Sequence, residues 1–181
     1  MSTFDIGIIG CSALKLFGYA DHDFEYRMLE ADIKAELAYM ITDAGMLPEQ
    51  TCIHALTSPG TSLLSARAAK SLGCHVHLIE CKHGQIENNR FKRGPFSSDA
   101  LEDLISYADE VTYAKEGQIV TEYMSAYEDF VDNGYAVLAS VPMPMTGTIP
   151  DIVCASAEEA GLVVRVLDVL STHPMKMKER P

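Results

Sequence analysis

Small hydroxyl-bearing residues gather beside glycine at three places in the chain: Gly10-Cys11-Ser12, Thr57 to Ser62 (TSPGTS), and Thr146-Gly147-Thr148. Glycine allows a close backbone approach, and backbone N–H groups with Ser or Thr hydroxyls at a helix N-terminus are good donors to a phosphate. The same residues also cap helices with no ligand present. The predicted ligand-binding residues are Gly10, Cys11, Ser12, Ser58, Gly60, Thr61, Ser62, Thr146, Gly147 and Thr148.

The first two segments match neither the GxGxxG pattern nor the P-loop lysine pattern, so we do not expect a conventional dinucleotide or ATP site. The chain also contains no GxSxG, no Cys paired locally with His, and no carboxylate pair at a defined separation. We therefore predict no catalytic residue, and the sequence identifies no cofactor.

Histidine and cysteine residues raise the hypothesis of a metal site. His75 and His77 alternate in one run, so both imidazoles face the same side of a strand, and the other residues of this kind nearby are His54, His83, Cys74 and Cys81. An edge strand with one wetter face explains the alternation without a metal, and we predict that arrangement and no metal ligands. We interpret Asp21-His22-Asp23 as helix capping in the same way.

Four of the 14 basic residues lie in one segment, which contains Lys82, Arg90, Lys92 and Arg93. This segment could reach a phosphate or a nucleic-acid backbone, and it could equally be a solvated loop. The formal net charge of -12 disfavours a protein that coats nucleic acid, but it permits a small anionic ligand held by local N–H groups.

Short apolar runs alternate with segments of helical period, which is typical of βαβ units around a parallel sheet. The predicted fold class is a single three-layer αβα domain with a mostly parallel sheet of about six strands. The expected strands are Phe4 to Ile9, Cys52 to Leu56, His75 to Glu80, Glu110 to Tyr113, Tyr135 to Val141 and Leu162 to Val169. The expected helices are a first one with Phe24, Met28, Leu29, Ile33, Leu37, Met40 and Ile41 on its buried face, then Thr61 to Leu72, Ser98 to Tyr107, Ile119 to Asn133 and Pro150 to Ala160.

The length of 181 residues suits one domain, which we expect over residues 1–171, with residues 172–181 as a flexible tail. Five widely spaced cysteines without a CxxC motif indicate reduced thiols in a cytoplasmic protein. The sequence shows no signal peptide and no apolar run long enough to span a membrane, so no membrane partner is expected. A homo-oligomer is compatible with the sequence.

The order of these features resembles the YpsA-like (DUF1273) branch of the SLOG superfamily, which has a Rossmann-like fold and is related to DprA and the LOG phosphohydrolases. The resemblance covers about residues 5 to 169. Its pieces are Gly10, Leu16-Phe17-Gly18 with Asp21, Ser58 to Gly60, Ala68-Ala69, His77-Leu78-Ile79, Tyr107 to Val111, Asn133-Gly134 and Thr146-Gly147-Thr148.

The resemblance implies a Rossmann-like fold and a crevice for a nucleotide or nucleotide-derived signal, such as an ADP-ribose-like molecule. Aligned on Ala68-Ala69, the chain has Ser65 where the family has an acidic residue and Arg67 where it has an aromatic one. The LOG glutamate also has no counterpart, so we expect binding rather than catalysis. Two alternatives stay open: a LOG-type N-glycosidase or phosphoribohydrolase whose acid is Glu80 or Glu122, and a DNA-processing or interaction protein that uses the segment from Lys82 to Arg93.

Overall fold

The computed structural model describes residues 3–17, 23–80, 96–114 and 119–170. In this part of the chain, helices follow strands in alternation, as the sequence predicts. The strands are β1 (Phe4–Gly10), β2 (Thr51–Leu56), β3 (His75–Glu80), β4 (Glu110–Tyr113), β5 (Ala136–Val141) and β6 (Val164–Asp168). The helices are η1 (Ala13–Lys15), α1 (Asp23–Asp43), η2 (Pro48–Gln50), α2 (Thr61–Leu72), α3 (Ser98–Tyr107), α4 (Ile119–Asp132) and α5 (Ile149–Glu159).

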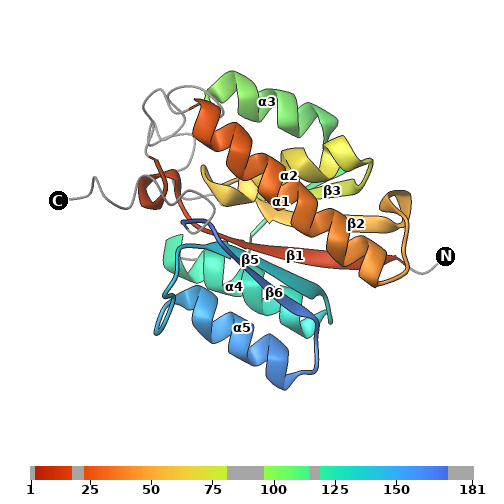
Figure 1. Ribbon diagram of the computed structural model, residues 1–181, viewed down its shortest axis with the longest axis vertical. Coiled ribbons are helices and arrows are strands. Elements are labelled where there is room, and N and C mark those ends of the chain that lie inside the picture. Colours follow the sequence, from red (N-terminus) through yellow and green to blue (C-terminus); the bar gives the residue numbers. More distant parts are fainter. Residues whose placement is uncertain (1–2, 18–22, 81–95, 115–118, 171–181) are drawn as a thin grey trace.

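The six strands form one parallel sheet in the order β4-β3-β2-β1-β5-β6. Helices α1, α2 and α3 lie on one face of the sheet, and α4 and α5 lie on the other (Figure 1). The predicted three-layer α/β fold of the Rossmann-like type is therefore confirmed. Because the strands are parallel, the segments that follow them lie at one edge of the sheet.

The larger part of the core lies between the sheet and α1, α2 and α3. It includes Ile6 and Ile8 of β1, Ile53 of β2, and Leu64 of α2, all fully buried. The buried face of α1 consists of Tyr26, Leu29, Ile33, Leu37, Met40 and Ile41. Two residues that we expected on this face, Phe24 and Met28, are instead 70% and 43% exposed, because the buried stripe passes through Tyr26 rather than through them.

The second part of the core lies under α4 and α5, where Phe130 of α4 packs against β1 at Gly7. A Cβ atom at Gly7 would lie only 2.4 Å from Phe130 Cδ2. Phe130 is itself 1% exposed, so it has no free space into which it could withdraw. The missing side chain at Gly7 therefore sets how closely α4 approaches the centre of the sheet.

The strand from His75 to Glu80 is not an edge strand, so that prediction was wrong. β3 pairs with β2 on one side and with β4 on the other, and the edges of the sheet are β4 and β6. Its polar positions have a different cause. α4 packs on β1 and β5, and α5 on β5 and β6, so the side of β3 that carries His77 is only partly covered.

Filling the space at Gly7 should destabilise the protein. We expect Gly7→Ala to lower the free energy of unfolding by about 1–3 kcal/mol, because the new methyl group overlaps the ring of Phe130. Urea denaturation followed by circular dichroism measures this directly, which suits a chain without Trp. Phe130→Leu alone completes the comparison, because the interaction is read from the two single variants and the double variant. Adding Phe130→Leu to Gly7→Ala should recover part of the loss, and strictly additive losses would contradict the contact.

Candidate functional site

The strand order reverses between β1 and β5, which lie side by side at the centre of the sheet although β2, β3 and β4 come between them along the chain. In open α/β sheets, ligands bind outside the carboxyl ends of the strands at such a switch point. Here the flanking segments are the one after Gly10 and the one after Val141. These segments contain two of the three predicted glycine and hydroxyl clusters. We call this region the switch-point crevice, after this general rule for open α/β sheets.

The hydroxyl of Thr61 joins three segments beside the crevice. The Cys11 N–H donates to Thr61 Oγ1 at 2.8 Å, and the Thr61 hydroxyl donates to the carbonyl oxygen of Ser140 at 2.8 Å. The backbone N–H of Thr61 donates back to the Cys11 carbonyl at 3.1 Å. Thr61 is fully buried, so these bonds fix the segment after β1 against the start of α2 and the end of β5.

Two of the predicted glycines serve this packing. Gly60 has a φ of 146°, and a Cβ atom there would lie 1.9 Å from the Cys11 carbonyl oxygen. At Gly10, a Cβ atom would lie 2.3 Å from Ser62 Oγ. The backbone of Cys11 thus occupies the space beside Gly60 in which we expected a ligand.

The predicted residues consequently differ in how accessible they are. Gly60, Thr61 and Ser62 are buried under the segment that follows β1, whereas Gly10, Cys11, Ser12 and Ser58 are half-buried. A ligand at this edge would meet Cys11, Ser12 and Ser58 first. Burial raises the pKa of the Cys11 thiol to about 11, and Lys15 acts in the opposite direction through its positive charge. The Cys11 thiol is therefore neutral at physiological pH, and the positive charge of Lys15 acts on it.

The third predicted cluster lies open on the other side of the switch point. Thr146 and Gly147 are exposed, and Thr148 is the N-cap of α5, where its hydroxyl accepts the Asp151 N–H. The Gly147 N–H donates to Asp151 Oδ2 at 2.8 Å. Capping, which was the alternative interpretation of Thr148, is thus observed, and Thr146 remains accessible from solvent.

One buried group at this edge lacks a partner. Among the residues that the structure describes, Ser140 Oγ is a fully buried side-chain oxygen with no hydrogen-bond partner. Ser140 pairs in register with Gly10, at the carboxyl ends of β5 and β1. A buried hydroxyl left in this way costs free energy, and an ordered water is the usual means of satisfying it.

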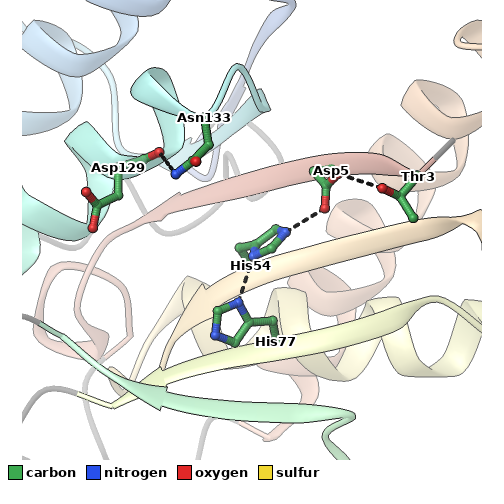
Figure 2. A network of polar contacts seen from close by, with 6 residues as sticks. All are labelled: Thr3, Asp5, His54, His77, Asp129 and Asn133. Carbon is green, nitrogen blue, oxygen red and sulfur yellow. Dashed lines mark hydrogen bonds and ion pairs between the residues drawn. The ribbon is translucent and has the colours of Figure 1, made fainter.

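A row of polar side chains crosses the sheet on the face that carries α4. His54 Nε2 lies 2.9 Å from Asp5 Oδ1, and His54 Nδ1 lies 2.9 Å from His77 Nδ1 (Figure 2). The row continues from His77 Nε2 to Thr112 Oγ1 at 2.7 Å. It therefore connects β1, β2, β3 and β4 through four consecutive side chains, which we call the polar row.

The carboxylate at one end of the polar row determines which ring nitrogens of the two histidines carry a proton. A carboxylate only accepts, so His54 carries a proton on Nε2 and donates it to Asp5. In the neutral pair, His54 Nδ1 then accepts from the Nδ1–H of His77, and His77 Nε2 accepts from the Thr112 hydroxyl. Protonating His54 would reverse the two bonds of His77, so the row responds as a unit.

A hollow of about 200 Å³ lies beside the polar row, between β4 and α4. His54 and His77 line it, together with Thr112 of β4, Asp129 of α4, and Tyr135. The Tyr135 ring stacks on His54 with a centroid separation of 4.3 Å. Burial lowers the pKa of His77, and the neighbouring His54 lowers it further, so His77 stays neutral at physiological pH.

Not all of the histidines and cysteines in the metal hypothesis come together. Cys74 lies in the core on the opposite face of the sheet, and His75 pairs with Asp109 at 3.5 Å. Asp21, His22, Cys81, His83 and the basic segment from Lys82 to Arg93 lie outside the described residues.

The sequence interpretation missed Asp5, Thr112 and Tyr135. The available signal was a polar residue inside an apolar strand run, as at Asp5 in FDIGII.

The positions at which the chain departs from the YpsA-like pattern have structural roles. Ser65 is buried, and its hydroxyl donates to the Thr61 carbonyl at 2.8 Å. Arg67 forms an ion pair with Glu30 at 3.1 Å. Of the two alternative acids, Glu80 is half-buried at the end of β3, and Glu122 lies in α4.

No family model matches the chain, and no curated protein is similar to it. Among solved structures, the chain is similar to DNA processing protein A (DprA) from Streptococcus pneumoniae, at 13% sequence identity and a TM-score of 0.38. The similarity covers 94% of this chain and 62% of that one, so the chain spans less than two thirds of DprA. The YpsA-like assignment stays a prediction.

None of the helices in the described ranges is long and apolar enough to cross a membrane.

Removing the Thr61 hydroxyl should weaken the fold at the switch-point crevice. We expect Thr61→Val to lower the free energy of unfolding by about 1–3 kcal/mol, because the half-buried Cys11 N–H loses its acceptor and the buried Ser140 carbonyl loses a donor. Thr61→Ser, which keeps the hydroxyl, is the matched control and should lose less. Equal losses in the two variants would show that the methyl group contributes as much as the hydroxyl, which would contradict the role of the hydroxyl in joining the three segments.

The lowered pKa of His77 makes stability depend on pH in a defined direction. Between the ordinary histidine pKa of about 6.5 and the lower value in the folded protein, the unfolded chain binds the proton and the folded one does not. Stability should therefore fall as pH decreases below about 6.5, and His77→Gln should reduce this slope. Denaturation at several pH values measures it, with His75→Gln as the control. A slope unaffected by His77→Gln would contradict the assignment.

Proposed function

We propose that this chain is a YpsA-like SLOG protein that binds a nucleotide or nucleotide-derived molecule, such as an ADP-ribose-like ligand, in the switch-point crevice. The observation that carries the proposal is the reversal of strand order between β1 and β5, with predicted ligand residues on both sides of it. The accessible members are Cys11, Ser12, Thr146 and Gly147.

The chemistry around Cys11 supports an anionic group on that ligand. Lys15 is exposed and close enough to the thiol for its charge to lower the thiol pKa, so a cation stands at the crevice of an otherwise acidic protein. Hydroxyls of Ser12, Ser58 and Thr146 add neutral donors. A phosphate needs this combination of a local cation and hydroxyl donors, and it does not need a net basic protein.

The proposal is for binding without turnover. N-glycosidic cleavage needs a carboxylate to activate water, and the family position for that residue holds Ser65, whose hydroxyl is buried and bound to the Thr61 carbonyl. A neutral hydroxyl in that place is neither a base nor an anion.

A thermal-shift screen tests the proposal. AMP, ADP-ribose, NAD, cyclic nucleotides and short DNA are each added at millimolar concentration, and we expect at least one nucleotide to raise the melting temperature by several degrees. A ligand at 100 times its dissociation constant adds about 2.7 kcal/mol to the free energy of unfolding. A shift with DNA alone would favour the DNA-processing alternative, and no shift at all would remove the support for a nucleotide site.

A variant of Lys15 locates the site. We expect Lys15→Ala to weaken binding of the phosphate-bearing hit by about tenfold, equivalent to about 1.4 kcal/mol, because it removes the cation beside Cys11. Lys34→Ala removes the same charge from α1 and should leave the affinity unchanged. Isothermal titration calorimetry gives both values. Equal affinities in the two variants would place the ligand away from the crevice.

A further inference from the structure

A group of polar side chains lies at the β1 end of the polar row, near the amino-terminal ends of β1 and β2 and away from the switch-point crevice. There Asp5 of β1 pairs in register with Cys52 of β2, and His54 lies two residues further along β2. Their carboxylate oxygen, sulfur and ring nitrogen all lie within 4.8 Å of one another. Among the residues that the structure describes, no other three His, Cys, Asp or Glu side chains lie this close together.

We propose that Asp5, Cys52 and His54 form a binding site for a divalent transition-metal ion of the Zn²⁺ type. Carboxylate, thiolate and imidazole are the three ligand classes that zinc takes in proteins. Three protein ligands leave one position of a tetrahedron for water or another molecule, as in zinc sites that are not purely structural.

The present spacing is near that of a tetrahedral site. With metal–ligand bonds of about 2.0–2.3 Å, ligand atoms around zinc lie about 3.3–3.7 Å apart. The His54–Asp5 separation of 2.9 Å would have to widen slightly, and the longest separation, at most 4.8 Å, would have to shorten by about 1 Å. Both changes are within reach of side-chain rotation, because Asp5 is 25% exposed and Cys52 is half-buried.

The electrostatic field at Cys52 favours a cation. The pKa of this thiol is raised to about 12, first by burial and then by the negative charges of Asp5, Asp109 and Glu110. Lys70 offsets Asp109 through an ion pair of 3.1 Å, which leaves Asp5 and Glu110. The carboxylate charges that help to hold the proton on Cys52 also attract a divalent ion in its place.

His77 and Thr112 would position the ligand His54. When His54 binds the ion through Nε2, its Nδ1 must carry the proton, and the hydrogen bond to His77 Nδ1 accepts that proton. His77 then donates from Nε2 to Thr112 Oγ1. His54 loses a proton from Nε2, His77 gains one on Nε2, and the proton between the two Nδ1 atoms moves from His77 to His54. The net release is the single thiol proton of Cys52.

Calorimetric titration of the metal-free full chain with Zn²⁺ at pH 7.5 tests the site, repeated in buffers of different ionisation enthalpy. We expect one ion per chain and a release of about one proton. Cys52→Ser should weaken binding more than tenfold and reduce the proton release to about zero, while Cys154→Ser, which alters a buried cysteine of α5, should change neither.

Cobalt provides a readout that depends on the sulfur itself. With Co²⁺, the wild-type protein and Cys154→Ser should show a thiolate-to-cobalt charge-transfer band in the near ultraviolet, and Cys52→Ser should lack it. His77→Phe should keep the band and weaken binding by roughly 10- to 100-fold, as expected of a positioning residue. Circular dichroism confirms that each variant is folded.

Two results would overturn the proposal. One is the absence of Zn²⁺ binding at micromolar concentration to the folded wild-type chain. The other is binding and a charge-transfer band that persist in folded Cys52→Ser and Asp5→Asn, since the ion would then be held by other residues.

Discussion

The centre of this protein depends on the hydroxyl of Thr61. It accepts the N–H of Cys11, in the segment that follows β1, and donates to the carbonyl of Ser140 in β5. β1 and β5 are neighbours in the sheet, but their paired residues, such as Gly10 and Ser140, are 130 positions apart in the sequence, so local chain geometry cannot align their carboxyl ends. The buried Thr61 hydroxyl, with one donor and two acceptor sites, aligns these ends instead. It can reach Cys11 only because Gly60 has no side chain and lets the segment after β1 contact the start of α2.

The same constraint explains which parts of the site could be predicted. The alternation of apolar runs and helical segments predicts the strands and helices to within a few residues, because periodicity is a local property. The use of Gly60 is not local. Its space is filled by Cys11, about 50 residues away, and no pattern within TSPGTS distinguishes a glycine that admits a ligand from one that admits another backbone.

At β3, the sequence contained a signal, the alternating histidines, but the edge strand that it predicts is wrong. The polar residues His75 and His77 predict an edge strand, yet β3 is interior. Buried polar groups must find partners, and His77 has them in His54 and Thr112 through the register of β2, β3 and β4. The polar row needs four strands in register, so the sequence of one strand cannot predict its partners. Each polar residue in an apolar run indicates only that some partner exists.

The protein thus presents two regions of different chemistry, with neutral donors and Lys15 at the carboxyl edge of the sheet, and carboxylate, thiol and imidazole groups at its amino-terminal side. The central claim is that a phosphate-bearing nucleotide binds at the first. Amide chemical-shift mapping of the isotope-labelled protein during titration with ADP-ribose or AMP tests it most directly. The account predicts the largest shifts at Cys11, Ser12, Lys15, Thr146 and Gly147. Shifts centred on His77, Thr112 and Asp129, or none at saturating ligand, would contradict it.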